Sequence, residues 1–260
     1  MVSEHYTRVP DLADVILAAY GDDDIGIDDL APVDEFHLGG AAATAALVAD
    51  LRLADGDRVL DIGCGIGGPA RRMAALSGCT VTGVDLTASF IDAASALSAR
   101  VGSGARVSFE VGDATELGSG RTFTVATLVH VGMNIADKAE LFSSVAAALE
   151  PGGRFGIYDI MRVGDGDLTL PLPFASTDDH AFVERPEDYL SALDGAGFEC
   201  DDPVDRTELA LQAAAAAGAQ GPPPASLQTL MGPDFAAMFT NLGAAIRGGV
   251  LAPVQIVARR

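Results

Sequence analysis

Two hydrophobic periods alternate along the middle of the chain. Short apolar runs such as Val59, Leu60 and Ile62 have the length of buried strands, and longer stretches with helical spacing follow them. This alternation is typical of a parallel sheet covered by helices on both faces. We predict strands at 59–62, 81–85, 105–111, 122–129 and 154–158, and helices at 70–76, 87–100 and 137–149.

Further elements flank this core. Residues 9–20 have helical spacing, and the acidic segment 21–30 then interrupts the pattern. The proline-containing segment 164–175 leaves the fifth strand as an irregular loop, which we expect to form a wall of a ligand site. Other predicted elements are helices at 41–51, 186–195, 208–217 and 234–246, a linker at 221–224, and strands from 197 and at 250–257.

The helix at 234–246 carries an apolar stripe. Such a stripe is more often core packing than a substrate-binding wall, but its position leaves both roles open. Its members are Phe235, Met238, Phe239, Leu242 and Ile246.

Composition restricts the class of protein. The chain has 260 residues, 49% of them hydrophobic, which is enough for one α/β domain. No apolar run approaches the roughly 18 residues that span a bilayer, and Met1–Tyr6 does not resemble a signal peptide. Cys64, Cys79 and Cys200 form neither a CxxC pair nor a metal-ligand cluster, so we predict a cytoplasmic location and no metal.

The formal net charge of -21 argues against a nucleic-acid partner, because phosphates would be repelled. The acidity fits either adaptation to salt or ordinary surface charge, and the sequence leaves the two open. An acidic field would attract a cationic amine.

A glycine turn follows the first predicted strand. Gly63, Gly65 and Gly67 come shortly after Asp61 and before the helix at 70–76. Glycines let the backbone turn sharply and approach a ligand, and a helix N-terminus favours negative charge. Asp85 ends the second strand, where a carboxylate can accept hydrogen bonds from both ribose hydroxyls. These features predict a nucleoside cofactor.

Two cofactors fit this turn. With Gly68 it satisfies G-x-G-x-x-G, which leaves NAD as an alternative. The D-x-G-x-G-x-G run from Asp61 instead resembles motif I of the class I S-adenosylmethionine-dependent methyltransferases. Three later features resemble landmarks of that family: the strand at 105–111 followed by Asp113, the strand at 122–129 followed by His130, and the Leu-Glu-Pro-Gly-Gly run at 149–153. The resemblance covers about residues 57–160 and favours S-adenosylmethionine; the chain also lacks a Tyr-x-x-x-Lys pair.

The resemblance implies a Rossmann-like, doubly wound α/β fold. We expect seven strands, mostly parallel, with an antiparallel last strand, N-terminal lid helices and a helical insertion before that strand. The expected single methyltransferase domain spans 1–260 and consists of a lid at 1–52, a cofactor-binding core at 57–160, a substrate-side loop, helix and sixth strand at 161–206, an insertion at 207–249 and a final strand at 250–260.

Ligands of such sheets bind at the carboxyl ends of the strands, where Gly63, Asp85, Asp113, His130 and Asp159 are all predicted to lie. The resemblance implies that Asp113 holds the adenine amino group and that Tyr20 and His37 close over the methionine moiety of the cofactor. A purely structural role for His37, as the cap of a turn, stays open. The expected cofactor contacts are Tyr20, His37, Gly40, Asp61, Gly63, Cys64, Gly65, Gly67, Asp85, Leu86, Asp113, Ala114, Val129 and His130.

Methyl transfer from a sulfonium requires alignment, exclusion of water and an acceptor with a free lone pair. The candidate catalytic residues are His130, whose ordinary pKa suits proton removal near neutrality, and Asp159. Three roles are open for Asp159: it would anchor a cationic acceptor, orient His130 or cap the following turn. A purely cofactor-binding role for His130 stays open. Lesser candidates are Asn134, Tyr158 and Arg162.

We hypothesise a cytoplasmic S-adenosylmethionine-dependent methyltransferase of the small-molecule branch, similar to the sarcosine/dimethylglycine and ubiquinone methyltransferases. N-methylation is favoured over O-methylation by the acidic balance and by Asp159. The alternatives are a non-catalytic S-adenosylmethionine-binding sensor or scaffold and an NAD-dependent oxidoreductase. The acceptor is not determined by the sequence, and a homodimer stays open.

Overall fold

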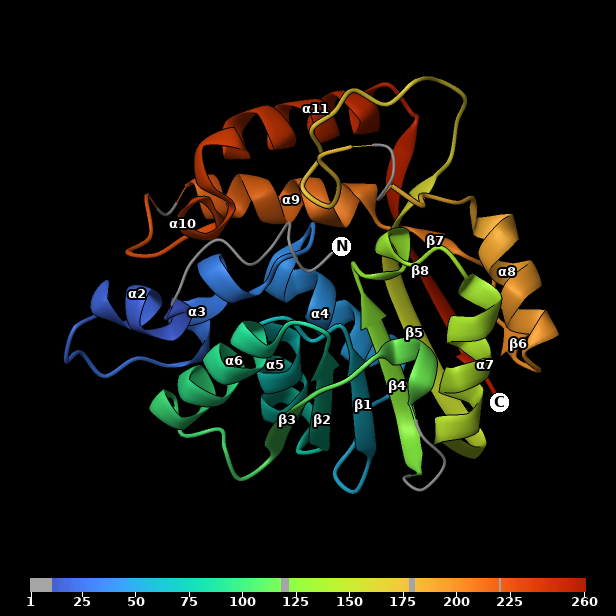
Figure 1. Cartoon of the computed structure of the whole chain (residues 1–260), viewed down its shortest axis with the longest axis horizontal. Coiled ribbons are helices and arrows are strands. Elements are labelled where there is room, and N and C mark those ends of the chain that lie inside the picture. Colours follow the sequence, from blue (N-terminus) through green and yellow to red (C-terminus); the bar gives the residue numbers. More distant parts are fainter. Residues whose placement is uncertain (1–10, 118–121, 178–180, 220) are drawn as a thin grey trace.

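An eight-stranded sheet forms the centre of the computed structural model, which describes residues 11–117, 122–177, 181–219 and 221–260 (Figure 1). The strand order is β3-β2-β1-β4-β5-β8-β6, and β7 also pairs with β8. Strands β1 to β5 are parallel, whereas β8 is antiparallel to its neighbours. The expected doubly wound sheet is confirmed. Its strands are β1 (Arg58–Ile62), β2 (Thr80–Asp85), β3 (Val107–Val111), β4 (Phe123–Val129), β5 (Leu149–Arg162), β6 (Glu199–Cys200), β7 (Val204–Asp205) and β8 (Leu251–Arg259).

Two strands differ from their predicted form. Strand β5 is longer at both ends than the predicted 154–158, and its register against β4 shifts between Phe123 and Val125, next to the Pro-Gly-Gly run at 151–153. The expected sixth strand is divided into β6 and β7, which both pair with β8.

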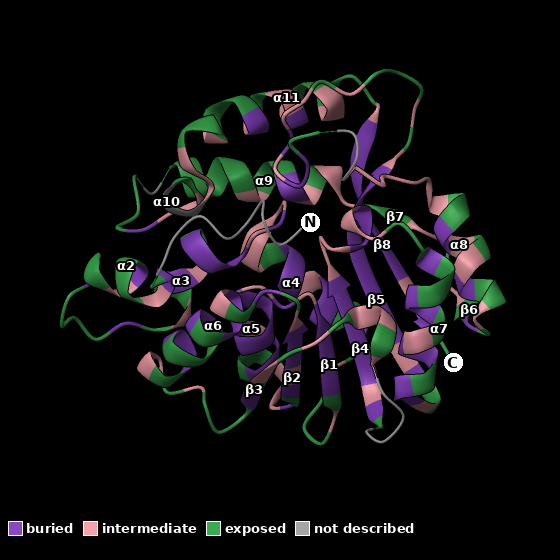
Figure 2. Ribbon diagram, in the orientation of Figure 1, coloured by how far each residue is buried: buried purple, intermediate pink, exposed green. Residues whose placement is uncertain are grey.

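Alternate residues of the central strands face two helical layers. Leu60 and Ile62 pack in one core with residues of α7 and α8, while Val59 packs in a second core with residues of α4 and α5. Figure 2 shows the central strands largely buried, which explains their continuous apolar runs. The helices of these layers and their neighbours are α4 (Gly40–Asp50), α5 (Gly68–Ser77), α6 (Ala88–Arg100), α7 (Lys138–Ala148) and α8 (Pro186–Gly195), with the short 3₁₀ helices η1 (Ala114–Glu116) and η2 (Gly132–Asn134).

Two helices precede α4. Helix α2 spans Leu12–Ala18, and α3 spans Ile27–Asp34. The prediction that the acidic segment interrupts helical structure through residue 30 is therefore wrong from Ile27 onward. The acidic residues stabilise the first turn, because Asp29 Oδ2 accepts a hydrogen bond from the Gly26 N–H at 2.8 Å. The predictions for Met1–Tyr6 and for the first two residues of the 9–20 helix lie outside the described residues.

Three helices near the C-terminus lie together at one end of the sheet, at the top of Figure 1. They are α9 (Thr207–Gly218), α10 (Leu227–Met231) and α11 (Phe235–Arg247), with the 3₁₀ helix η4 (Gly232–Asp234) between the last two. Helix α10 packs against α3 and α9 packs against α4, so segments from both ends of the chain meet here. Among the described helices, none is long and apolar enough to cross a membrane.

Candidate functional site

The glycine turn joins β1 to α5 and lies against the end of β2. The backbone N–H groups of Gly63 and Cys64 both donate to the carbonyl of Val84, at 2.8 and 3.1 Å. Gly63 has a φ of 66°, and a Cβ at this position would lie 2.3 Å from a methyl group of Val131. Only glycine fits this conformation and this contact, so the turn has no tolerance for a side chain here.

The carboxylate of Asp85 connects the turn to the loop after β2. Its Oδ2 accepts a hydrogen bond from the Gly65 N–H at 3.0 Å, and its Oδ1 accepts one from the Thr87 N–H at 2.9 Å. Burial raises the pKa of Asp85, and the two backbone donors oppose that shift. Because each carboxylate oxygen has two lone pairs, Asp85 keeps acceptor capacity for a ligand.

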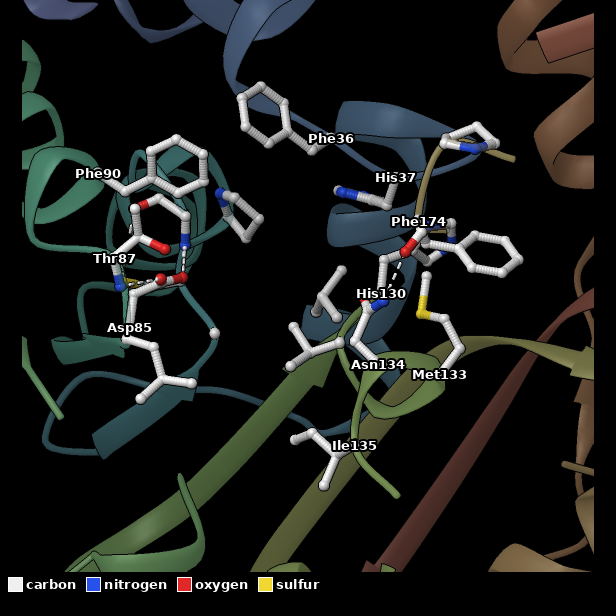
Figure 3. A pocket seen from close by; sticks show the side chains of 18 of the residues that line it. Phe36, His37, Asp85, Thr87, Phe90, His130, Met133, Asn134, Ile135 and Phe174 are labelled. Atoms are coloured by element: carbon white, nitrogen blue, oxygen red, sulfur yellow. Dashed lines mark hydrogen bonds between the residues drawn. The ribbon is translucent and has the colours of Figure 1, made fainter. Parts of the chain in front are cut away.

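A cavity of about 390 Å³ opens at the carboxyl ends of β1, β2 and β4. One side, the polar half, is formed mainly by Gly65, Asp85, Leu86, Thr87, Asp113 and Thr115. The other side, the apolar half, is formed by Met133, Ile160, Phe174 and Leu242, which belong to one hydrophobic cluster, and Met238 and Phe239 of α11 also line the cavity. Figure 3 shows Asp85 and Thr87 across the cavity from Met133 and Phe174.

Most of the expected contact residues line this cavity. They are His37, Gly63, Cys64, Gly65, Asp85, Leu86, Asp113, Ala114, Val129 and His130. The expected residues outside the lining are Tyr20, Gly40, Asp61, Gly67 and Asp159.

Tyr20 and Gly40 act within the N-terminal segment. The Tyr20 hydroxyl donates to the carbonyl of Asp29 at 2.6 Å, and the ring packs in a core with α2 and α3. The carbonyl of Gly40 accepts from Nε2 of His37 at 3.0 Å. These two residues support the N-terminal segment and do not line the cavity.

Asp61 lies beneath the turn and is 1% exposed. Its Oδ1 accepts from the Thr127 hydroxyl at 2.8 Å, whereas its buried Oδ2 has no partner among the described residues. Burial raises the pKa of Asp61 to about 7. A buried carboxylate oxygen without a donor is costly, so this atom marks a position where a ligand donor would be stabilising.

Asp159 is placed away from the cavity, contrary to its expected role. Its Oδ2 accepts from the Tyr189 hydroxyl at 2.8 Å and from the Met133 N–H at 3.1 Å, and its Oδ1 accepts from the Ile160 N–H. Burial raises the pKa of Asp159 to about 7. Asp159 therefore orients η2 and α8 from below the cavity wall. Of the lesser candidates, Asn134 lines the cavity, whereas Tyr158 and Arg162 do not.

Three rings meet at the junction of the two halves. His130 stacks on Tyr158 with ring centroids 5.5 Å apart, and His37 meets His130 edge-on at 5.7 Å. His130 has a left-handed φ of 55°, a conformation that costs about 1–2 kcal/mol in a residue with a side chain. Burial lowers the pKa of both histidines, that of His37 to about 4, so both are neutral near pH 7.

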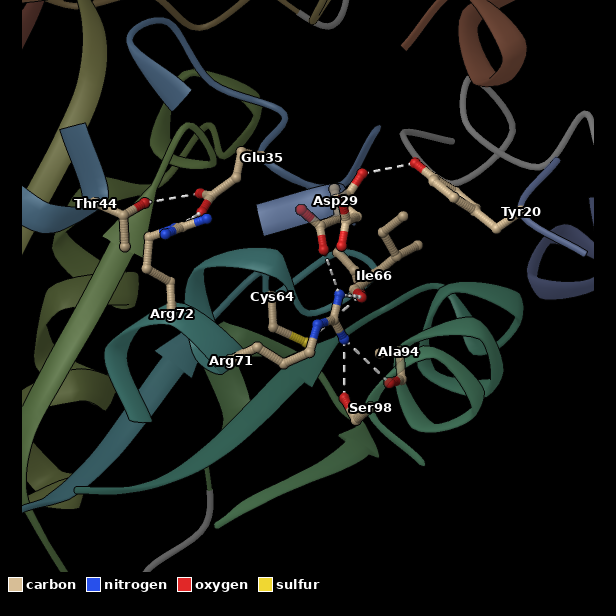
Figure 4. A network of polar contacts seen from close by, with 12 residues as sticks. Tyr20, Asp29, Glu35, Thr44, Cys64, Ile66, Arg71, Arg72, Ala94 and Ser98 are labelled. Atoms are coloured by element: carbon tan, nitrogen blue, oxygen red, sulfur yellow. Dashed lines mark hydrogen bonds and ion pairs between the residues drawn. The ribbon is translucent and has the colours of Figure 1, made fainter. Parts of the chain in front are cut away.

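Two ion pairs attach α3 and the residue that follows it to α5, as Figure 4 shows. Arg71 Nη2 lies 2.7 Å from Asp34 Oδ2 and also donates to the carbonyl of Ile66 in the glycine turn at 2.7 Å. Arg72 Nε donates to Glu35 Oε1 at 2.6 Å. The N-terminal segment is thereby joined to the turn itself.

Sequence reasoning missed several lining residues. Phe36 and Phe90 meet edge-on with centroids 6.3 Å apart, and both line the cavity beside Thr87. Met133 and Phe174 belong to segments that follow β4 and β5. The rule that ligands bind beyond strand ends indicates the segment after β4, and Phe174 lies in the 164–175 loop that was expected to form a wall of the site. No group of three or more His, Cys, Asp or Glu suitable for a metal occurs in the described parts of the chain.

Residues 59–153 match the family described as "Methyltransferase domain". Methyltransferase GfsG of Streptomyces halstedii is 27% identical over 188 residues, which cover 69% of this chain and 66% of that protein. Phosphoethanolamine N-methyltransferase 1 of Zea mays is 39% identical over 125 residues, covering 48% of this chain but 25% of that protein. The chain thus spans less than two thirds of the length of these relatives.

The crystal structure of geranyl diphosphate C-methyltransferase from Streptomyces coelicolor A3(2), in complex with Mg²⁺, geranyl-S-thiolodiphosphate and S-adenosyl-L-homocysteine, has the same fold. The TM-score is 0.69 at 20% identity, covering 100% of this chain and 96% of that one.

Proposed function

We infer that this chain, which contains a class I S-adenosylmethionine-dependent methyltransferase domain, transfers the methyl group of S-adenosylmethionine to a small-molecule acceptor. The observation that carries the proposal is the Asp85 carboxylate, fixed by the Gly65 and Thr87 N–H groups at the cavity wall. This arrangement presents an oriented acceptor for the two ribose hydroxyls of the cofactor.

Other residues of the polar half also suit the cofactor. Leu86 is 57% exposed although it lines a cavity, so it offers an apolar surface for the adenine ring. Asp113 Oδ1 accepts from the Thr115 N–H at 2.9 Å, which leaves lone pairs of the carboxylate for the adenine amino group. The unpartnered Oδ2 of Asp61 lies beneath the glycine turn and outside the cavity lining, and its negative charge would favour the ammonium group at the other end of the molecule.

The cofactor supplies a methyl group attached to a positively charged sulfur. The acceptor lone pair forms the new bond to the methyl carbon as the carbon–sulfur bond breaks, and that electron pair remains on the sulfur of S-adenosylhomocysteine. The cavity walls exclude water and orient the acceptor. A proton lost by the acceptor goes to His130. His130 lines the cavity and its Nε2 is a buried atom without a partner among the described residues, so we propose this ring as the group that receives the proton.

The identity of the acceptor atom is a separate question from that of the cofactor. The preference for nitrogen depended partly on Asp159, whose oxygens accept from Tyr189 and from backbone N–H groups instead. The similar proteins include enzymes named for N-methylation and for C-methylation, so similarity does not choose between them. We propose an acceptor that is uncharged at the reacting atom, because burial keeps the His130 ring neutral and a neutral ring offers no counter-charge to a cation.

Calorimetric titration with S-adenosylhomocysteine, and separately with NAD, tests the cofactor. We expect binding of S-adenosylhomocysteine alone, weakened by about 1–3 kcal/mol in Asp85→Ala because buried hydrogen-bonding groups lose their partner. Asp92→Ala, which removes an exposed carboxylate of α6, is the matched control. Binding of NAD alone would favour the oxidoreductase alternative, and equal affinity in wild type and Asp85→Ala would contradict the site.

Turnover distinguishes an enzyme from a sensor or scaffold. The protein is incubated with S-adenosylmethionine and a small-molecule metabolite extract, and S-adenosylhomocysteine is measured over time. Production above that of the Asp85→Ala variant supports methyl transfer. Tight cofactor binding with no production from any extract would favour the sensor.

A further inference from the structure

We propose that the body of the methyl acceptor is uncharged and predominantly apolar, and that it occupies the apolar half of the cavity against α11. This inference rests on the proposed function and adds the chemical class of its substrate. It replaces the cationic amine that the acidic composition suggests.

The apolar half is built from three segments that are distant in sequence. Ile160 is on β5, Phe174 is in the loop that follows it, and Leu242 is on α11. These three side chains also belong to one buried hydrophobic cluster, together with Met133. The cavity is therefore continuous with a core, and an apolar molecule placed there would extend that core.

The polar side chains beside this region bind to the protein backbone. Asn134 Nδ2 donates to the carbonyl of Phe174 at 2.7 Å, and Asn241 Nδ2 donates to the carbonyl of Pro171 at 3.0 Å. Leu172 and Ala175 exchange backbone hydrogen bonds within the same loop. These bonds hold the loop against η2 and α11, and Figure 3 shows the bond from Asn134 to the carbonyl of Phe174. The two side-chain amides therefore stabilise the cavity wall.

Carboxylates are absent from the described residues of the apolar half. The cavity lining contains three, Asp34, Asp85 and Asp113, and none belongs to β5, the loop after it or α11. Asp34 is paired with Arg71, and Asp85 accepts from two backbone N–H groups. An ammonium group buried in the apolar half would lack a counter-charge, and burying an unpaired charge is strongly unfavourable. An uncharged molecule has no such cost.

The apolar stripe of α11 is divided between two roles. Met238, Phe239 and Leu242 line the cavity, whereas Phe235 does not, although its ring lies 4.6 Å from that of Phe239 between centroids. Phe235 and Phe239 are both partly exposed. They form a matched pair, because replacing either one removes the same ring contact and only one of them faces the cavity.

Two fluorescent probes of similar size test the proposal with the protein saturated by S-adenosylhomocysteine. At pH 7, 2-naphthol is neutral and 2-naphthylmethylamine is cationic. We expect 2-naphthol to bind at least about tenfold more tightly, since an unpaired buried charge is penalised. We expect Phe239→Asp to weaken 2-naphthol binding by about tenfold or more and to improve binding of the amine, while Phe235→Asp changes either affinity less than about twofold.

The outcomes separate this inference from the proposed function. Failure of S-adenosylhomocysteine to bind would overturn the proposed function and the inference with it. Normal binding of S-adenosylhomocysteine with equal or tighter binding of the amine would overturn the inference alone. Equal effects of the two aspartate variants on 2-naphthol would also overturn it. Retained S-adenosylhomocysteine affinity in both variants serves as the check on folding.

Discussion

Arg71 connects the N-terminal helices to the glycine turn, and its replacement by methionine tests how much this buried ion pair contributes to stability. The side chain is fully buried, and its guanidinium donates to Asp34, to the Ile66 carbonyl and to the Ser98 hydroxyl at 2.7, 2.7 and 2.8 Å. Methionine fills similar space without charge or donors. The change leaves the Asp34 carboxylate, itself buried, without its cation.

The size of the effect follows from this burial. Removing one partner of a buried ion pair costs about 3–5 kcal/mol, and we expect a loss of that size in the free energy of unfolding at pH 8. The same substitution at Arg58, which pairs with Glu150 at the surface, should cost less than about 1 kcal/mol. The double variant Arg71→Met/Asp34→Asn should recover much of the loss, because no buried charge then remains unpaired.

The pH dependence gives a second check. Burial raises the pKa of Asp34 to about 6, even though Arg71 lowers it. A carboxyl whose pKa is raised in the folded state gains protons on folding, so its contribution to stability is present at low pH and is lost as the pH rises through that value. Without Arg71 the pKa rises further. The difference in free energy of unfolding between wild type and Arg71→Met should therefore become smaller from pH 8 to pH 5.5.

Urea denaturation followed by circular dichroism measures each of these differences. A deficit below about 1 kcal/mol at pH 8 would refute the reasoning, since it would equal that expected for a surface pair. If the loss in the free energy of unfolding is unchanged at pH 5.5, or if the double variant is as unstable as the single one, then the unpaired Asp34 carboxylate is not the cause of the loss.

Three further outcomes are expected. In His130→Asn the asparagine tolerates the left-handed backbone, so the fold is kept while the proposed base is lost. Turnover should fall by about 10²–10⁴-fold with S-adenosylhomocysteine affinity retained, and loss of that affinity in calorimetry would indicate a binding role instead. Affinity for S-adenosylhomocysteine should rise from pH 6 to pH 8, because Asp61, whose pKa is about 7, ionises and then attracts the ligand ammonium. The same rise in affinity with pH in Asp61→Asn would contradict this explanation. Gly63→Ala should abolish measurable calorimetric binding because its Cβ collides with Val131, and unchanged affinity would mean that the turn can relax.

The cofactor side of the site was predictable because its signals are local. The glycine turn and the strand end at Asp85 are short motifs whose geometry is dictated by their own residues and by pairing with the adjacent strand. Helix α3 was not predicted because its acidic first turn, Asp28 and Asp29, reads as a solvated loop until the cap at Gly26 is seen. Acidic residues also stabilise the first turn of a helix, so the same residues are compatible with a solvated loop or with a helix start.

Asp159 shows how an error of a few residues changes a role. The prediction ended the fifth strand at Tyr158 and therefore expected Asp159 at the mouth of the cavity. Strand β5 continues to Arg162, so Asp159 remains within the pleat. Because successive side chains of a strand point to opposite faces, its carboxylate turns toward Tyr189 of α8. Strand length, which depends on pairing with β8, could not be read from the residues alone.

The loop that carries Phe174 was expected to form a wall of the site, but the part of the wall on α11 could not be predicted, for a different reason. A hydrophobic stripe on α11 has the same spacing whether it packs on protein or faces a ligand, and only the tertiary structure separates Phe235 from Phe239. Ile160, Phe174 and α11 all lie outside residues 59–153, the part that matches the family. The residues that would choose the acceptor can therefore change while the cofactor turn stays the same.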